Sequence, residues 1–417
     1  KWKIVSIINV MNINFIDLFA GAGGLSEGFV KEGFTPIAFI EKDMDACYTL
    51  KTRLAYWYLK ETNNLNLYEK YLRNEISRTQ LYENIPSSVL EKVIDMEINE
   101  NTIDLIFNKI EKILGNEKID IILGGPPCQT YSVLGRSVMK EKVINDNRNY
   151  LFKFYLRFLE RYKPSIFLFE NVVGLLSANN GDYFRNIISS FNEIGYTINY
   201  KILNASDFGV LQNRKRIIII GTKSGINFVF PKPKPELISG ITLKDIFYDL
   251  PKPSDKHSKE IFFYTKEINE YLKRTEIRNN FNFTTLHIVN KVNDIYKEIY
   301  RFAVKSLFEK NKQINYTELP DCLKTRKNQR FIKFRVLNPS GISTTILSKV
   351  TELLIYPDYE NPRAISIRES ARIQSFPDDY FFEGGKDSCF KQLGNAVPVL
   401  LAQELAKQIK QILNKNE

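Results

Sequence analysis

Short apolar runs alternate with amphipathic stretches through the first half of the chain, and each run stops at a glycine or a polar residue. The runs that we interpret as strands cover residues 13–18, 35–40, 120–123 and 165–169. Helical patterns lie between them, for example at 25–32 and 150–162. This order of elements indicates an α/β fold with a doubly wound parallel sheet. Ligands of such sheets bind beyond the carboxyl ends of the strands, so the loops after these runs are the candidate site.

The remainder of the chain is less regular. By periodicity, residues 44–118 are mostly helical, and the runs at 196–203 and 216–221 are late strands that can form a hairpin. From Pro231 to about residue 340 the chain is basic, aromatic and irregular, which predicts a separate module. Two further helices are expected, at 366–374 and 399–413.

Cys128 lies in the sequence Gly-Gly-Pro-Pro-Cys-Gln-Thr-Tyr-Ser, residues 124–132, directly after a predicted strand. A thiol at the end of a buried strand, in a loop stiffened by two prolines, is where an α/β enzyme would hold a nucleophile. A free cysteine is also a small hydrophobe that packs at turns. The position alone leaves both interpretations open.

A glycine-rich turn, Gly21-Ala-Gly-Gly24, joins the first strand to its helix. Glycines let a cofactor approach the backbone, and the helix start offers free amides. The dinucleotide fingerprint is not met because position 26 is serine, which favours a smaller nucleoside cofactor. Glu41 ends the second strand, where an acid commonly accepts hydrogen bonds from ribose hydroxyls. A tight packing turn and a solvated acid are the competing interpretations.

Three further charged residues are candidates for the active site. Glu170 could act as an acid, and Arg214 and Arg216 could hold a substrate group. A carboxyl at the edge of an apolar sheet can have a raised pKa and act as an acid. The arginines alternate on one face of a strand start, so both can point into a site and hold a carboxylate, a phosphate or a reacting base. A capping carboxylate and a solvated charge cluster remain the alternatives.

These groups together suggest covalent catalysis on an electron-poor ring. A thiolate adds to the ring while an acid assists at a ring nitrogen. The neighbouring carbon then becomes nucleophilic toward an electrophilic methyl group. Such a reaction suits a pyrimidine, whose C5 is otherwise a poor nucleophile.

The net charge of +11 is concentrated in residues 222–340, which hold 23 Lys and Arg against 13 Asp and Glu. A solvated lysine-rich surface would explain this surplus. Its position beside a catalytic body favours a polyanion-binding face, and nucleic acid is the usual polyanion.

Cysteine and histidine usage argues against a metal centre. The four cysteines lie far apart without a C-x-x-C pair, which disfavours a disulfide framework or a zinc site. The two histidines, His257 and His287, sit in no motif. No apolar stretch is long enough to span a bilayer, so we expect a cytoplasmic protein.

The ordered motifs resemble those of the cytosine-C5 DNA methyltransferase family, of the bacterial restriction-modification type. The resemblance covers most of the chain. One such motif alone is moderate evidence for the family, whereas several motifs in the family's order are highly specific for it. The blocks are Asp17–Leu25, Gly125–Ser132, Glu170–Val172, Gln212–Arg216, Arg368–Pro377 and Gln392–Pro398.

The resemblance implies a DNA (cytosine-5-)-methyltransferase with a Rossmann-like sheet that binds S-adenosyl-L-methionine and releases S-adenosyl-L-homocysteine. Cys128, with Gln129 beside it, would attack C6 of a cytosine flipped out of duplex DNA. Glu170 would contact N3 and the amino group, and Arg214 and Arg216 would steady the base and that carboxylate. The implied cofactor residues are Asp17, Phe19, Ala20, Gly21, Gly23, Gly24, Leu25, Glu41, Lys42, Glu97, Ile98, Pro127, Asn395, Ala396 and Val397. The implied DNA contacts are Ser132, Gln212 and basic residues within 223–340.

The resemblance also implies a division of the chain. Residues 11–222 would form the catalytic domain, 223–345 a smaller, irregular target-recognition domain, 346–380 a ninth-motif segment, and 381–417 a segment that returns to the catalytic domain. The expected partner is double-stranded DNA, bound by a monomer that associates with the nucleoid. A separately encoded restriction endonuclease is a further partner that the family type suggests.

Two other functions compete with this one. A related branch methylates cytosine in tRNA, but the long basic segment favours DNA. An inactive DNA-binding relative is disfavoured by intact Cys128, Glu170, Arg214 and Arg216. The DNA sequence that is recognised has no readable code in this segment.

Overall fold

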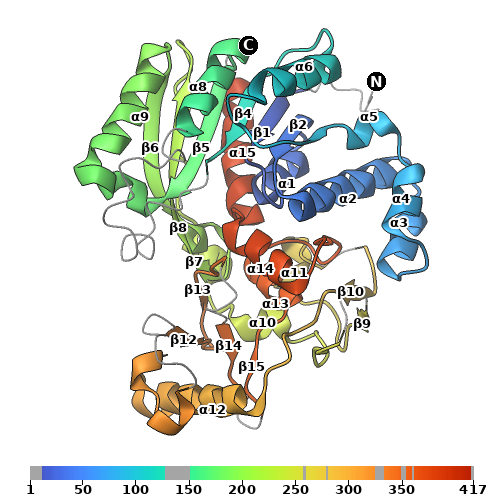
Figure 1. The fold of residues 1–417 in the computed structure, drawn as a ribbon, viewed down its shortest axis with the longest axis vertical. Coiled ribbons are helices and arrows are strands. Elements are labelled where there is room, and N and C mark those ends of the chain that lie inside the picture. The colour runs from blue at the N-terminus through green and yellow to red at the C-terminus, as the bar shows by residue number, and fades with distance from the viewer. Residues whose placement is uncertain are drawn as a thin grey trace.

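The computed structural model describes residues 12–126, 151–256, 260–278, 280–324, 333–348, 354–358 and 361–414. Its central sheet has the strand order β3-β2-β1-β4-β5-β8-β6 (Figure 1). The strands are β1 (Asn14–Leu18), β2 (Thr35–Glu41), β3 (Val93–Asp95), β4 (Ile121–Gly124), β5 (Ile166–Val172), β6 (Thr197–Asn204) and β8 (Lys215–Thr222). β8 runs antiparallel to both of its neighbours, and the other pairs are parallel. The predicted doubly wound α/β fold is confirmed, and the two late strands do pair as expected.

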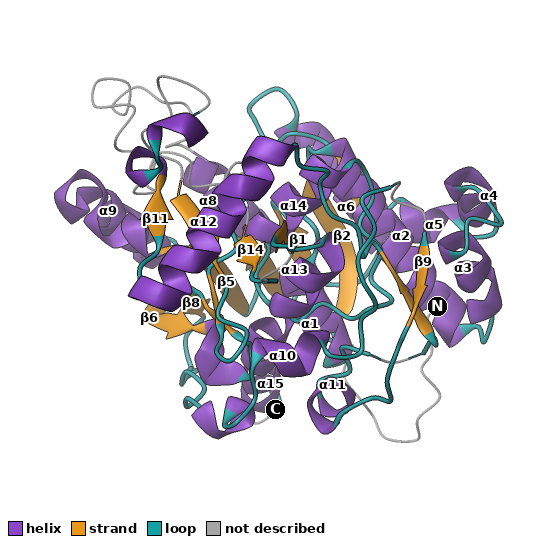
Figure 2. Ribbon diagram, turned by 90° about the horizontal axis from the view of Figure 1, so that it is seen from below, coloured by secondary structure: helices purple, strands orange, loops and turns teal. Residues whose placement is uncertain are grey.

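Helices cover both faces of this sheet (Figures 1 and 2). Phe15 of β1 faces the core beneath one helical layer, whereas the next residue, Ile16, faces the core beneath the other. The first layer contains α1 (Gly24–Lys31), α2 (Met44–Glu61) and α15 (Val399–Leu413). The second contains α6 (Ile103–Leu114), α8 (Leu151–Tyr162) and α9 (Asp182–Glu193). A strand buried on both faces requires apolar residues at successive positions, which explains the unbroken apolar runs in the sequence.

Residues 44–118 form the helical spacer that the periodicity predicts, with one exception. Besides α2 and α6 it contains α3 (Leu65–Leu72), α4 (Arg78–Glu83) and α5 (Ser87–Leu90). The exception is β3, an edge strand that pairs with β2. Three residues give too short a pattern to distinguish a strand from its helical surroundings.

The segment after residue 230 is more ordered than the irregular module that we expected. Its lower part carries the 17-residue helix α12 (Asp294–Lys310), whose Ile299 and Val304 pack against a small sheet (Figure 1). That sheet has the order β11-β12-β14-β15, with β11 (Ile314–Asn315), β12 (Lys333–Val336), β14 (Leu354–Tyr356) and β15 (Arg363–Ala364). Aromatic residues and charges are spread through α12, and its weak amphipathic pattern hides the helix in the sequence. Two strands come from beyond residue 345, so this sheet crosses the predicted boundary between segments.

Short elements link this lower part to the catalytic body. They are α10 (Leu243–Phe247), α11 (Glu270–Arg274), α13 (Ile367–Ile373), α14 (Lys386–Asn395), the hairpin of β9 (Ile261–Phe263) with β10 (Phe283–Thr285), and the parallel pair of β7 (Gln212–Asn213) with β13 (Ser343–Thr344). Within the described ranges, no helix has both the length and the apolar character of a membrane span.

The C-terminal helix α15 packs directly on α1, which brings the end of the chain back to the first motif (Figure 1). The two backbones meet at Gly28, where an added methyl group would come within 2.5 Å of both the Ala402 Cβ and the Gln403 nitrogen. A side chain larger than hydrogen at residue 28 would therefore separate the two helices.

Candidate active site

The glycine-rich turn after β1 is shaped by close neighbours. Gly23 has a φ of 75°, and a Cβ there would lie 2.8 Å from Leu50 Cδ2 and 3.0 Å from the Tyr380 hydroxyl. A Cβ on Gly24 would lie 2.3 Å from the Val397 carbonyl oxygen. Gly21 has a φ of 54°, yet no atom lies within 4 Å of its Cβ position. The turn is thus packed on its inner side and open at Gly21.

Glu41 joins this turn to the next loop. One carboxylate oxygen accepts a hydrogen bond from the Gly21 amide at 2.8 Å, and the other accepts from the Lys42 and Asp43 amides, each at 2.8 Å. The Lys42 ammonium in turn contacts Glu97, at 2.6 Å, in the loop after β3. The next residue, Ile98, is buried in the core. Glu41 and Lys42, predicted from the loop after the second strand, and Glu97, predicted from a distant position, therefore lie along one edge of the sheet.

Three further predicted cofactor residues lie near the turn. Phe19 has a φ of 57° and packs partly against the core beneath α6 and α8. The Ala20 amide donates to the Ile40 carbonyl at 3.2 Å, which fixes the turn to β2. The Leu25 side chain is buried in the core under α1, so this residue can reach a ligand only through its backbone.

Asp17 is the buried acid at the end of β1. Its side chain is 1 % exposed and accepts a hydrogen bond from the Ser26 hydroxyl. Burial raises the pKa of Asp17 to about 7; the nearby Glu41 charge adds to the rise, and the Ser26 hydrogen bond opposes it. The carboxyl is therefore partly protonated at neutral pH.

This raised pKa predicts that the contribution of Asp17 to stability falls with rising pH. Between about pH 4 and pH 7 the unfolded chain ionises Asp17 while the folded chain keeps the proton, so folding loses up to about 1.4 kcal/mol per pH unit. Asp17→Asn should remove this loss, and the amide oxygen of the substituted side chain can still accept from Ser26. Urea unfolding at pH 5 and pH 8 measures the difference, with Asp182→Asn on exposed α9 as the control. An equal pH slope in wild type and Asp17→Asn would contradict the expectation.

The turn after α14 closes over the glycine-rich turn. It follows Asn395, the last residue of α14, and contains Ala396 and Val397; the Val397 carbonyl faces Gly24 as described above. The Tyr380 hydroxyl donates to the Ala22 carbonyl from the same side. Residues more than 350 positions apart in the chain are thus in contact beside the predicted cofactor loop.

Glu170 and Arg216 form the polar pair at the ends of β5 and β8. The Arg216 Nε lies 2.8 Å from a Glu170 carboxylate oxygen, and their side chains are 13 % and 15 % exposed. Val172 is directly opposite Arg216 in the antiparallel register, so Glu170, two residues away, is its diagonal neighbour on the same face. The strand pairing itself therefore brings these two side chains together.

Two glycines pack the start of the nucleophile loop tightly against β1 and β5. A Cβ on Gly124 would lie 2.0 Å from the Leu18 carbonyl oxygen, and one on Gly125 would lie 1.9 Å from that of Glu170. The buried Asn171 side-chain amide donates to the Pro126 carbonyl at 3.3 Å. Pro127, Cys128, Gln129 and Ser132 lie outside the described residues, but the chain enters that segment beside Glu170.

Arg214 does not share the role of Arg216, contrary to expectation. It is fully buried, and its two terminal nitrogens donate to the Ile346 carbonyl at 3.1 Å and the Gly394 carbonyl at 2.9 Å. Burial, and then the neighbouring Arg216 charge, lower the pKa of Arg214, while Glu170 opposes them. The alternation on the strand predicted a common direction but could not reveal the carbonyls that hold Arg214.

The predicted DNA contact of Gln212 is also contradicted, because such a contact requires an accessible side chain. Its side chain is 0 % exposed. The amide nitrogen donates to Gln374 at 2.9 Å, and the oxygen accepts from the Ile346 amide at 3.1 Å. Gln212 therefore joins parts of the protein to one another.

Comparison with known proteins shows which family has this sheet and these motifs. The family model for C-5 cytosine-specific DNA methylases matches residues 13–76 and 68–411. The chain belongs to this family. It is a DNA cytosine-5-methyltransferase.

Curated relatives share almost the full length of this methyltransferase. The Type II methyltransferase M.Bpa9945I of Bacillus paralicheniformis is 38 % identical over 96 % of this chain and 99 % of its own. M.DdeI of Desulfomicrobium norvegicum is 30 % identical, with 95 % of this chain and 88 % of its own covered. Among solved structures, one described as a DNA modification methyltransferase encoded within an Escherichia coli prophage has a TM-score of 0.65 at 24 % identity, covering 97 % of this chain and all of that one. This structural similarity supports the α/β fold of the methyltransferase.

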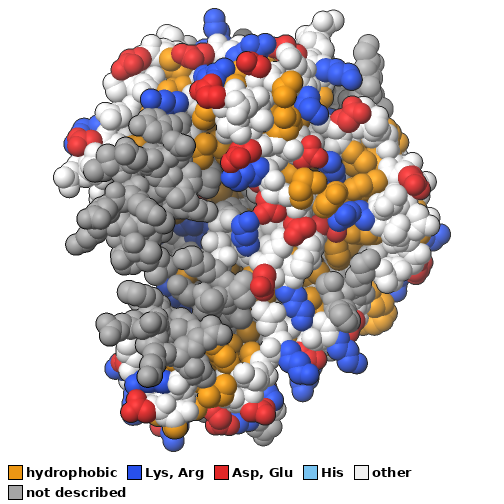
Figure 3. Space-filling view, in the orientation of Figure 1, with side chains coloured by type: hydrophobic (Ala, Val, Ile, Leu, Met, Phe, Trp, Pro, Cys, Tyr) orange, Lys and Arg blue, Asp and Glu red, His pale blue; other side chains and the backbone are white. Residues whose placement is uncertain are grey.

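The excess of Lys and Arg over Asp and Glu in residues 222–340 is not concentrated on the exposed face of α12. Charges there pair along the helix, as Lys297 with Asp294 and Arg301 with Glu298. On the face drawn in Figure 3, basic and acidic side chains are likewise interspersed over the described surface. Among the described residues, no cluster of three or more His, Cys, Asp or Glu is arranged to hold a metal ion.

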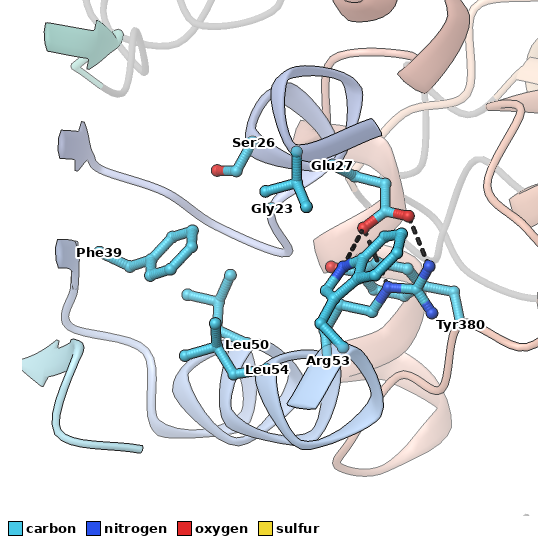
Figure 4. A pocket seen from close by; sticks show the side chains of 10 residues that line it. Gly23, Ser26, Glu27, Phe39, Leu50, Arg53, Leu54 and Tyr380 are labelled. Carbon is cyan, nitrogen blue, oxygen red and sulfur yellow. Dashed lines mark hydrogen bonds and ion pairs between the residues drawn. The ribbon is translucent and has the colours of Figure 1, made fainter. Parts of the chain in front are cut away.

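The sequence analysis did not identify three residues that lie behind the predicted cofactor loop: Glu27, Arg53 and Tyr380. Behind Gly23 lies a cavity of about 20 Å³, large enough for one water molecule, between α1 and α2 (Figure 4). Arg53 lines it and forms ion pairs with Glu27 at 2.5 Å and with Asp379 at 2.9 Å. A buried glutamate in the first turn of a predicted helix was the one available signal, because such an acid requires a partner.

Proposed function

We propose that this enzyme transfers a methyl group from S-adenosyl-L-methionine to C5 of a flipped cytosine in a specific duplex DNA sequence, through a covalent bond between Cys128 and C6. The observation that carries the proposal is the Glu170–Arg216 pair at 2.8 Å, beside the point where the chain enters the Cys128 loop. An acid held next to a thiol is what activation of a pyrimidine ring requires.

The residues at the sheet edge fit an adenosyl cofactor. The open side of Gly21 is a space that a Cβ would fill, and the start of α1 offers backbone amides there. Glu41 supplies a carboxylate suited to ribose hydroxyls, and Lys42, Glu97 and Ile98 flank it. When bound, the cofactor provides an electrophilic methyl group.

The side chains would promote the reaction in the following steps. The Cys128 thiolate forms a bond to C6, and the ring electrons move toward C5 while Glu170 assists at N3. Arg216 holds the Glu170 carboxylate in place. C5 would then take up the methyl group as its bond to the donor sulfur breaks, which releases S-adenosyl-L-homocysteine. A base would remove the C5 proton, and the thiolate would leave as the ring recovers its double bond. The target base must leave the helix to reach the thiol, so base flipping is part of the proposal.

Duplex DNA is the proposed partner, bound by a monomer through basic residues within 223–340. Phosphate contacts of this kind make affinity fall steeply with salt. The relatives that are named Type II methyltransferases support a role beside a separately encoded restriction endonuclease.

Trapping on fluorinated DNA tests the chemistry. Long duplexes amplified with 5-fluorodeoxycytidine triphosphate contain every short site, and fluorine blocks the final elimination. Wild type with S-adenosyl-L-methionine should form an adduct that survives denaturing electrophoresis, whereas Cys128→Ser should not. Cys322→Ser, at an exposed cysteine in the lower part, is the matched control and should trap normally. Absence of an adduct from wild type, or methylation of tRNA alone, would overturn the proposal.

A further inference from the structure

A buried tyrosine bridges the two strands that lead to the catalytic groups. Tyr155, on α8, is 0 % exposed, and its hydroxyl donates to the Ile122 carbonyl of β4 at 3.1 Å and to the Leu168 carbonyl of β5 at 3.0 Å. Burial raises the pKa of Tyr155 well above its usual value, so the hydroxyl keeps its proton and acts as the donor. The two carbonyls share this hydrogen, because a phenol has a single O–H donor. Tyr155 thus joins two neighbouring strands at one point.

The two acceptors occupy matching places in their strands. Each lies two residues before a residue of the active edge: Ile122 precedes Gly124, where the nucleophile loop begins, and Leu168 precedes Glu170. β4 and β5 pair in parallel, and the ladder between them ends at Gly124. The hydroxyl therefore lies just below the point at which the chain leaves β4 toward the thiol.

The spacing of β4 and β5 matters because the two backbones meet directly beyond this bridge. A Cβ on Gly125 would lie 1.9 Å from the Glu170 carbonyl oxygen, and the Asn171 amide donates to the Pro126 carbonyl at 3.3 Å. A change in strand spacing would therefore alter the position of the nucleophile loop relative to the Glu170 carboxyl. Displacements of about 1 Å at positioned groups can cost about 10²-fold in rate.

The surroundings of Tyr155 require an aromatic ring but no hydroxyl. Its ring centroid lies 5.2 Å from that of Phe169, 5.9 Å from that of Phe167 and 6.2 Å from that of Phe191. All four rings belong to the apolar core beneath α6, α8 and α9. Phenylalanine would fill the same space without the cost of bringing a hydroxyl into an apolar core. The two carbonyls that it joins account for the hydroxyl.

We propose that Tyr155 is a positioning residue for methyl transfer: its hydroxyl sets the spacing of β4 and β5 so that the Cys128 thiol and the Glu170 carboxyl reach the same ring. Tyr155 is buried and acts only through these two groups. The inference rests on the proposed function, because it requires that Cys128 and Glu170 act on one base.

Tyr155→Phe tests this role, with Tyr196→Phe as the matched control. Tyr196 is 4 % exposed in the same core, and its hydroxyl donates to the Pro164 carbonyl at 2.8 Å, near the opposite end of β5. Each substitution removes one buried hydroxyl and keeps the ring, so the urea midpoints of the two variants should fall by similar amounts. Single-turnover methylation of unmethylated bacterial genomic DNA should slow about 10-fold in Tyr155→Phe and stay within about twofold of wild type in Tyr196→Phe.

Two further measurements separate positioning from a general loss of structure. The dissociation constant of S-adenosyl-L-homocysteine, measured by equilibrium dialysis, should stay close to the wild-type value in both variants, because the cofactor loop follows β1. Tyr155→Phe should also slow the reaction less when it is added to Glu170→Gln than when it is added to wild type. Residues that act through one another are not additive.

The outcomes distinguish the two proposals. A wild type that neither methylates DNA nor forms the adduct on fluorinated DNA would overturn the proposed function. With an active wild type, equal rates in the two tyrosine variants, or full additivity with Glu170→Gln, would overturn the positioning role alone. The same conclusion would follow if Tyr155→Phe lost affinity for S-adenosyl-L-homocysteine in proportion to its rate. It would follow too if Tyr155→Phe did not fold and Tyr196→Phe did, because the hydroxyl would then serve the stability of the core.

Discussion

Replacing Glu170 with glutamine is expected to slow methyl transfer about 10²- to 10⁴-fold, the range typical of lost acid–base assistance. Glutamine has nearly the same shape, so the variant tests the carboxyl chemistry and not the packing. It cannot transfer a proton to a ring nitrogen, and it leaves the Arg216 charge without its anionic partner. Single-turnover methylation with both substrates saturating isolates the chemical step from binding.

Arg216→Met extends this test to the ion pair. Because the Glu170 and Arg216 side chains are in contact, the two substitutions should not be additive. If Arg216 acts by holding the carboxylate, adding Arg216→Met to Glu170→Gln should cost little further rate. Glu193→Gln at the exposed end of α9 is the control. A rate for Glu170→Gln within threefold of wild type would contradict the assigned role.

The sequence predicted the sheet because burial on both faces demands continuous apolar runs. β1, β4 and β5 satisfy this demand, and their ends were placed correctly within a few residues. β3 was missed because an edge strand of three residues carries almost no pattern. α12 was missed because its amphipathic pattern is weak and because the sheet that its Ile299 and Val304 contact is assembled from distant strands.

The Glu170–Arg216 contact could be anticipated in part, because Glu170 follows one apolar run, Arg216 precedes another, and the two runs pair as antiparallel strands. The environment of Gln212 and Arg214 could not. Their partners, Ile346, Gln374 and Gly394, lie more than 130 positions away in the chain. Local alternation gives the direction of a side chain relative to its own strand, but only the tertiary fold decides whether that direction meets solvent or a carbonyl oxygen.

The same limitation applies to a set of buried charges around α13. Arg372 is fully buried and forms ion pairs with Asp249 at 2.6 Å and Asp378 at 2.5 Å. Arg278 also contacts Asp249, at 3.0 Å, and the Tyr264 hydroxyl donates to Asp378 at 2.7 Å. Burial alone would raise the pKa of Asp378, but the charge and hydrogen bond of Arg372, helped by the Arg368 charge and the Tyr264 hydrogen bond, together hold the pKa below the usual value. This network fixes the end of α10 to the ninth-motif helix.

Arg372→Met should therefore lower the free energy of unfolding by about 3–5 kcal/mol at neutral pH, because it leaves two buried carboxylates without their main cation. Urea unfolding followed by circular dichroism measures the loss. Arg185→Met, which removes an exposed ion pair with Asp182, is the matched control and should change stability by less than about 1 kcal/mol.

The pH dependence of this deficit identifies its cause. In wild type the depressed pKa of Asp378 contributes stability above the usual carboxyl pKa, and that contribution is lost as the pH falls. In Arg372→Met the Asp378 carboxylate can instead take up a proton, so the deficit relative to wild type should shrink from pH 8 to pH 5. A deficit that is the same at both values would indicate lost packing of the arginine stem. A deficit that grows toward pH 5 would contradict the assignment of Arg372 as the counter-charge of Asp249 and Asp378.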